Sequence, residues 1–212
     1  MDGTIIDSER IYHRSQIKAL NDLGIKADPD LIAFYMSYGF KEHRQLFPDA
    51  IGVPDLDYDL MDQKMYEYYH EASKNGEVRL CQGTKQFLEY LVSNGIKTVL
   101  CTSTIRKTAE KELQNLGIYG YFDRLLCYED VAEHKPSPEV YLKAASLYPF
   151  SSDETLVIED AACGIRAAKA AGLRVALVPG IITFEQKWYD ACDHIVPVLT
   201  DIIPIIEKEA GR

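Results

Sequence analysis

The sequence predicts an α/β protein in which a parallel sheet is covered by helices on both faces and a helical insert precedes most of the sheet. From residue 97 onward, short apolar runs alternate with stretches of helical periodicity. This alternation is typical of a parallel sheet with crossover helices. Between about residues 10 and 79, only helical patterns occur, so this region is expected to be inserted between the first turn and the sheet.

Five apolar runs are expected to form the strands. They span residues 97–102, 124–129, 155–159, 174–179 and 194–199. In open parallel sheets, ligands bind beyond the carboxyl ends of the strands. The polar residues that follow these runs are therefore candidates for a functional site.

Helices are expected between these strands and throughout the insert. A helix is expected to begin at residues 137–139. Ser137 suits an N-cap, Pro138 suits the first turn, and Glu139 is an acid in the first turn. Pro204 is expected to shorten or kink the last helix. Four helical stretches are expected in the insert, over residues 9–24, 29–39, 41–47 and 58–74.

Composition and charge narrow the class of protein. The 212 residues are 47% hydrophobic and carry a net charge of −10, which is typical of a globular protein and argues against a nucleic-acid partner. No apolar run reaches the roughly 20 residues of a membrane span, and no leader is evident, so a cytoplasmic protein without a membrane partner is expected. The five cysteines lack Cys-x-x-Cys spacing and are expected to be reduced.

Four polar motifs lie at or just past predicted strand ends. Each alone has an ordinary explanation as a turn, a helix cap, a solvated loop or a surface acid pair. Together they offer carboxylates that suit Mg²⁺, and a lysine and hydroxyls that suit a phosphate group. Such local positive charge would also let this acidic chain accept an anionic substrate. The motifs are Asp2-Gly3-Thr4, Thr102-Ser103, Lys135-Pro136 and Glu159-Asp160.

These motifs occur as "DGTIIDSE", "VLCTST", "HKPSPEVYL" and "LVIEDAACGIRAAKAAG". These motifs and their order along the chain resemble those of the haloacid dehalogenase (HAD) superfamily of hydrolases. The chain most resembles the β-phosphoglucomutase-like phosphatase branch, which has a helical (C1) cap. The resemblance implies a Rossmann-like three-layer core formed by residues 1–9 and 80–212, and a cap formed by residues 10–79. It covers almost all of the core and is weaker in the cap.

The resemblance also implies residue roles for phosphoryl transfer. Asp2 would be the general acid/base. Thr102 would hydrogen-bond the phosphoryl group, and Ser103 would offer its backbone N–H. Lys135 would stabilise the negative charge of nucleophile and phosphate.

Metal and substrate residues follow from the same resemblance. Asp160 and the backbone carbonyl of Asp2 would bind Mg²⁺, with Glu159 as a further ligand or a neighbour of the metal. In the cap loop over residues 38–45, three side chains could reach a substrate in the expected fold. The same side chains would also be ordinary at solvated positions of a helix. They are Lys41, His43 and Arg44.

The family pattern is Asp-x-Asp-Gly-Thr at the end of the first strand, and Met1 stands at position x. The nucleophilic aspartate is therefore expected directly ahead of Met1, and the first core strand is expected to be missing from this chain. Without that carboxylate no aspartyl-phosphate forms, so the 212-residue chain is expected to be inactive. A miscalled start or truncation, an inactive product and a non-catalytic phosphate-binding protein are the open explanations.

The expected function is a Mg²⁺-dependent phosphatase of small phosphorylated metabolites, such as sugar or nucleoside phosphates, acting through an aspartyl-phosphate. A hexose-phosphate mutase of the same fold is the alternative enzyme. A truncated or catalytically inactive phosphate-binding protein is the alternative of another class. The protein is expected to be a monomer or a weak dimer.

Overall fold

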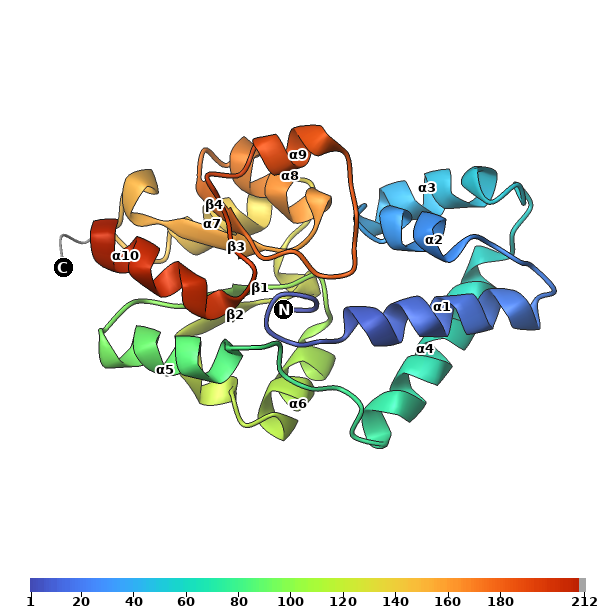
Figure 1. Ribbon diagram of the computed structural model, residues 1–212, viewed down its shortest axis with the longest axis horizontal. Helices are drawn as coiled ribbons and strands as arrows, with labels where there is room; N and C mark the ends of the chain where they lie inside the picture. Colours follow the sequence, from blue (N-terminus) through green and yellow to red (C-terminus); the bar gives the residue numbers. More distant parts are fainter. Residues whose placement is uncertain (210–212) are drawn as a thin grey trace.

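A computed structural model describes residues 1–209 and confirms an α/β protein with parallel strands (Figure 1). Each strand lies inside one of the five predicted runs. The strands are β1 (Val99–Cys101), β2 (Arg124–Leu126), β3 (Leu156–Glu159), β4 (Arg174–Leu177) and β5 (His194–Ile195).

The strands form two parallel sheets rather than one. β1 pairs with β2, with Leu100 opposite Leu125, and a second sheet has the order β3-β4-β5. Within residues 1–209, β1 and β3 each have one edge without a strand neighbour. The N-terminal residues form a tight turn, in which the backbone N–H groups of Ile5 and Ile6 both donate to the carbonyl of Met1.

Helices cover both faces of the strands. Successive strand residues point to opposite faces, so Val157 packs into one apolar cluster and Ile158 into the other. Ile158 faces α5 (Thr84–Ser93), α6 (Arg106–Asn115) and α10 (Ile203–Glu209). Val157 faces α7 (Glu139–Ala145), α8 (Ala162–Ala170) and α9 (Gln186–Asp190).

The last helix begins one residue before Pro204. A 3₁₀ turn, η4 (Leu199–Ile202), precedes α10, and Pro204 is the second residue of α10. A proline is tolerated there because its missing N–H would have no partner in the first turn. Three further 3₁₀ turns are η1 (Tyr119–Tyr121), η2 (Tyr128–Asp130) and η3 (Ser152–Glu154).

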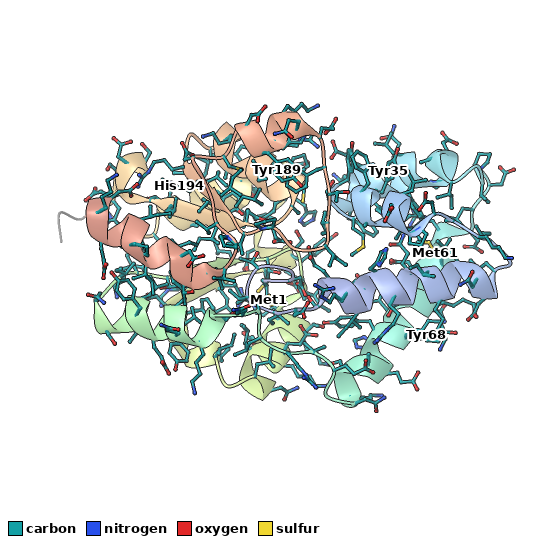
Figure 2. The ribbon with its side chains drawn as sticks, in the orientation of Figure 1. Met1, Tyr35, Met61, Tyr68, Tyr189 and His194 are labelled. Carbon is teal, nitrogen blue, oxygen red and sulfur yellow. The ribbon has the colours of Figure 1, made fainter. Side chains whose placement is uncertain are left out.

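Four helices form a separate group beside the sheets, here named the helical group (Figure 1). They are α1 (Glu9–Asp22), α2 (Pro29–Tyr35), α3 (Phe40–Ala50) and α4 (Tyr58–Lys74). Met61 of α4 is 1% exposed and packs with Ile32 and Phe47, so the group has an apolar cluster of its own (Figure 2). The helical prediction for this region is confirmed.

The chain enters and leaves the helical group at one place. The N–H of Asp7 donates to the carbonyl of Arg79 at 2.8 Å, and the N–H of Cys81 donates to the carbonyl of Ile5 at 3.0 Å. These two bonds hold the connecting segments side by side. No helix within residues 1–209 is long and apolar enough to cross a membrane, and all five cysteines are unpaired, as predicted.

Candidate functional site

The N-terminal turn directs Asp2 toward two hydroxyl groups. Gly3 has φ of +71°, a conformation that glycine adopts without strain. The Asp2 carboxylate accepts hydrogen bonds from Ser8 Oγ at 2.7 Å and from Thr104 Oγ1 at 2.8 Å. Thr104 was not predicted as a site residue, because a threonine ahead of a helix ordinarily indicates a cap.

The Thr102-Ser103 motif directly follows β1. The Thr102 side chain is buried, and its hydroxyl oxygen accepts the backbone N–H of Thr104 at 3.1 Å. The N–H of Thr102 donates to the carbonyl of Leu126 at 2.9 Å and continues the pairing of β1 with β2. Ser103 is exposed.

Lys135 and Glu159 form a buried ion pair. Lys135 Nζ lies 2.6 Å from Glu159 Oε1 and also donates to the carbonyl of Cys101 at 3.3 Å. The Tyr141 hydroxyl donates to the same carboxylate oxygen. Burial opposes charge on both groups, but their mutual attraction prevails, so the pKa of Lys135 is raised and the pKa of Glu159 is lowered. Both groups are therefore charged near neutral pH.

Asp160 faces a second buried acid, Glu9, the last residue of the DGTIIDSE motif, which was not among the predicted site residues. Both side chains are about 5% exposed. Asp160 Oδ1 accepts a hydrogen bond from Thr4 Oγ1 at 2.6 Å, and Glu9 Oε2 accepts the backbone N–H of Ile181 at 3.1 Å. Burial raises the pKa of both carboxyls, and the charges of Glu159 and Glu9 raise that of Asp160 further.

Hydrogen bonds join all four motifs into one polar cluster. Thr104 links the N-terminal turn to the segment after β1, and Thr4 links the same turn to Asp160. Lys135 bridges the ends of β1 and β3 through Cys101 and Glu159. The structure therefore brings the four motifs together at the carboxyl ends of two strands, which is where ligands of parallel sheets bind.

The residues present fit a hard cation at one point of the polar cluster. No three His, Cys, Asp or Glu side chains between residues 1 and 209 converge as a metal site, because Glu159 faces Lys135 and the Asp2 carboxylate faces hydroxyls. Asp160 Oδ2 and Glu9 Oε1, however, lie 2.1 and 2.6 Å from the position that a Cβ on Gly3 would occupy. Because Gly3 has no side chain, two carboxylate oxygens come together over its backbone, and such oxygens are the ligands that Mg²⁺ prefers.

The three predicted substrate residues of the helical group bind side chains outside the polar cluster. Lys41 pairs with Glu133 at 3.5 Å, and Arg44 pairs with Asp59 at 2.5 Å. His43 is 7% exposed, its Nδ1 lies 2.6 Å from the Tyr58 hydroxyl, and burial lowers its pKa to about 4. Within the described chain, none of the three is hydrogen-bonded to the polar cluster.

Neighbouring residues of this segment also contact the core. Glu42 forms two bonds with Arg166 of α8, at 2.7 and 2.8 Å, and the carbonyl of Ser37 accepts the N–H of Cys163 at 3.0 Å. A Cβ on Gly39 would lie 2.3 Å from the carbonyl oxygen of Lys135. The sequence offered no signal for the Glu42–Arg166 pair, since its partners are separated by more than a hundred residues.

The fold is that of an α/β protein with a polar cluster at the carboxyl ends of parallel strands, where such proteins bind ligands. The family model "Haloacid dehalogenase-like hydrolase" matches residues 1–178, and the chain belongs to this family. The resemblance stated from the four motifs is therefore confirmed.

Relatives and solved structures agree with this assignment. The chain is 28% identical to "Phosphorylated carbohydrates phosphatase" of Thermotoga maritima, over 82% of this chain and 79% of that protein. It is 26% identical to "Phosphoglycolate phosphatase" of Nitrosospira multiformis, over 99% and 94%. The fold is similar to that of a hydrolase from Pseudomonas syringae, with a TM-score of 0.82, 20% identity and coverage of 98% and 95%. It is also similar to CbbY from Rhodobacter sphaeroides in complex with phosphate, with a TM-score of 0.73, 23% identity and coverage of 95% and 93%.

Proposed function

We propose that this protein is a Mg²⁺-dependent phosphatase of small phosphorylated metabolites, such as sugar or nucleoside phosphates, acting through an aspartyl-phosphate. The observation that carries the proposal is the convergence of the four motifs at the ends of β1 and β3. Relatives named for phosphorylated carbohydrates and for phosphoglycolate support a phosphate ester as the substrate.

Lys135, Thr102 and Ser103 would receive the phosphoryl group. Lys135 is held in place by Glu159 and is charged before any substrate arrives. Thr102 would donate its hydroxyl, and Ser103 its backbone N–H. Donors that are fixed in advance need no reorganisation when charge develops in the transition state, and this favours phosphoryl transfer.

Asp2 would act as general acid/base and move a proton to or from the oxygen of the ester. Its side chain is bound by two hydroxyl groups, Ser8 and Thr104, which hold it at the polar cluster. A proton transfer of this kind contributes about 10²- to 10⁴-fold to a rate.

A divalent cation would be held by Asp160 and by the backbone carbonyl of Asp2, with Glu159 nearby. When bound, Mg²⁺ would neutralise charge on the phosphoryl oxygens. The nucleophile would be an aspartate directly ahead of Met1. The unpaired edges of β1 and β3 support a strand between them that would carry this aspartate.

The helical group would serve as the cap over this site, with residues 10–79 as cap and residues 1–9 and 80–212 as core. Its own apolar cluster and the paired connecting segments support this division. Closure of such a cap excludes water from the reaction. Lys41, whose side chain is 75% exposed, His43 and Arg44 are the residues proposed to reach a substrate from this side.

The test compares two proteins: the 212-residue chain and a version extended by the codons that precede Met1 in the genome. Phosphate release from p-nitrophenyl phosphate and from a panel of sugar and nucleoside phosphates is measured with and without Mg²⁺. The extended protein is expected to turn over only with Mg²⁺, and the 212-residue chain is expected to be inactive. Asp2→Asn in the extended protein should lower kcat about 10²- to 10⁴-fold.

Equal turnover by both proteins would refute an aspartate ahead of Met1 as the nucleophile. An extended protein that binds sugar phosphates but hydrolyses none would favour a non-catalytic phosphate-binding protein.

A further inference from the structure

Glu9 is a buried acid that the proposed reaction does not use. It is the first residue of α1 and 5% exposed. One carboxylate oxygen, Oε2, accepts the N–H of Ile181. The other, Oε1, is buried and meets no hydrogen-bond donor among residues 1–209. A buried carboxylate oxygen without a donor is unfavourable, so Oε1 requires another partner.

The atom that Oε1 faces is an oxygen of another acid. Glu9 Oε1 and Asp160 Oδ2 both project over Gly3, at 2.6 and 2.1 Å from the place of the missing Cβ. The other oxygen of Asp160 is already bound to Thr4. Glu9 Oε1 and Asp160 Oδ2 are therefore directed to the same point.

The surrounding backbone fixes this arrangement. A Cβ on Gly180 would lie 2.0 Å from Glu9 Oε2, just as a Cβ on Gly3 would clash with Asp160. Because Gly3 and Gly180 have no side chains, the backbone comes close to the carboxylates of Glu9 and Asp160 at two places. No ion pair between residues 1 and 209 includes Glu9 or Asp160, since the nearby cation, Lys135, is bound to Glu159.

Two buried carboxylates that face each other repel unless a proton or a cation lies between them. We propose that Glu9 Oε1 binds the same divalent cation as Asp160 Oδ2, so that Glu9 is a metal ligand in addition to the predicted residues. This inference rests on the proposed function, because it adds a ligand to the Mg²⁺ site of that reaction. Since Glu9 begins α1, the cation would also tie the first turn of the helical group to the end of β3.

The test measures metal binding directly and needs no turnover. Mn²⁺ is titrated into the 212-residue protein, and free Mn²⁺ is followed by its EPR signal. Glu9→Gln keeps the shape of the side chain and removes its charge, and it should weaken Mn²⁺ binding about tenfold or more. Asp160→Asn should weaken it at least as much. Glu112→Gln is the matched control, because Glu112 is also a buried acid with an unpartnered oxygen, and it should bind as the unaltered protein does.

Amide exchange provides a second readout. Mg²⁺ should slow exchange of the first-turn amides of α1 in the unaltered protein and leave them unchanged in Glu9→Gln. If Glu9→Gln does not fold, Glu9→Asp replaces it, and this shorter carboxylate should also weaken Mn²⁺ binding.

The outcomes separate this inference from the proposed function. Normal Mn²⁺ binding by Glu9→Gln together with loss of binding by Asp160→Asn would overturn the role of Glu9 and leave the proposed metal site intact. If the unaltered protein binds no Mn²⁺, or if Asp160→Asn binds it normally, the inference fails, while the metal requirement is decided separately by the turnover of the extended protein with and without Mg²⁺.

Discussion

At the scale of single residues, Glu112 has no role in the proposed reaction and yet is buried where the helical group meets the core. It lies on α6 and is 6% exposed. Oε1 accepts a hydrogen bond from the hydroxyl of Tyr69, on α4, at 2.7 Å, while Oε2 has no partner among the described residues. Burial raises the pKa of Glu112 to about 7, and the charge of Asp2 adds to this.

The raised pKa makes the stability contribution of Glu112 depend on pH. Near pH 4 the carboxyl is protonated in both the folded and the unfolded protein. Between its unfolded pKa of 4.5 and about 7, only the unfolded protein ionises, so stability falls as the pH rises. Above pH 7 the full penalty is present, roughly 3 kcal/mol.

Glu112→Gln should therefore stabilise the protein at pH 8 by up to roughly 3 kcal/mol and by much less at pH 5. Gln retains an acceptor for Tyr69 and does not titrate. Urea denaturation of both proteins at the two pH values measures the difference. A difference that does not change with pH would contradict the assignment of this titration to Glu112.

At the scale of elements, the packing of α8 on β3 depends on one glycine. Gly164 lies in the first turn of α8, and a Cβ there would lie 2.0 to 2.3 Å from the carboxyl atoms of Glu159. The lack of a side chain lets α8 begin against the carboxylate that holds Lys135. Glycine inside a helix otherwise costs about 1 kcal/mol relative to alanine.

Gly164→Ala should destabilise the protein by about 1–3 kcal/mol despite the better helix propensity of alanine, because overpacking outweighs propensity. Gly120→Ala is the control. Gly120 lies in η1, and a Cβ there would meet no atom within 4 Å. Thermal unfolding of both variants measures the contrast, and a stabilised Gly164→Ala would show that Glu159 moves aside without loss.

The elements themselves could largely be predicted from the sequence, because apolar runs and helical periodicity are local signals. The pairing of the strands into two sheets could not, because pairing joins segments that are far apart in the chain. The four motifs could be predicted because strand ends in a parallel sheet meet at one edge. Glu9 was missed because an acid in the first turn of a helix is ordinarily explained by the helix dipole.

At the scale of the whole molecule, contacts on two sides hold the helical group against the core. On one side, Glu42 and Arg166 form a two-bond pair, and the carbonyl of Ser37 accepts the N–H of Cys163. On the other, Tyr69 contacts Glu112. The Glu42–Arg166 pair has a geometry that gives strong charge-assisted hydrogen bonds.

Glu42→Gln should loosen the first of these contacts. Hydrogen bonds between charged groups contribute about 1.5–3 kcal/mol, so the Cys163 amide should exchange at least about tenfold faster with solvent. Asp59→Asn is the control, since Asp59 pairs with Arg44 inside the helical group, and it should leave this amide unchanged. Hydrogen exchange measured by mass spectrometry or NMR distinguishes the two. Equal protection in Glu42→Gln would mean that the ion pair does not restrain the helical group.

The paired segments around Asp7 and Arg79 have an evolutionary consequence. Because the chain departs and returns through neighbouring hydrogen-bonded positions, the intervening stretch can lengthen, shorten or be replaced without altering the path of the remaining polypeptide. With the helical group as the proposed cap, such an architecture would let substrate preference diversify while the residues of the polar cluster stay fixed.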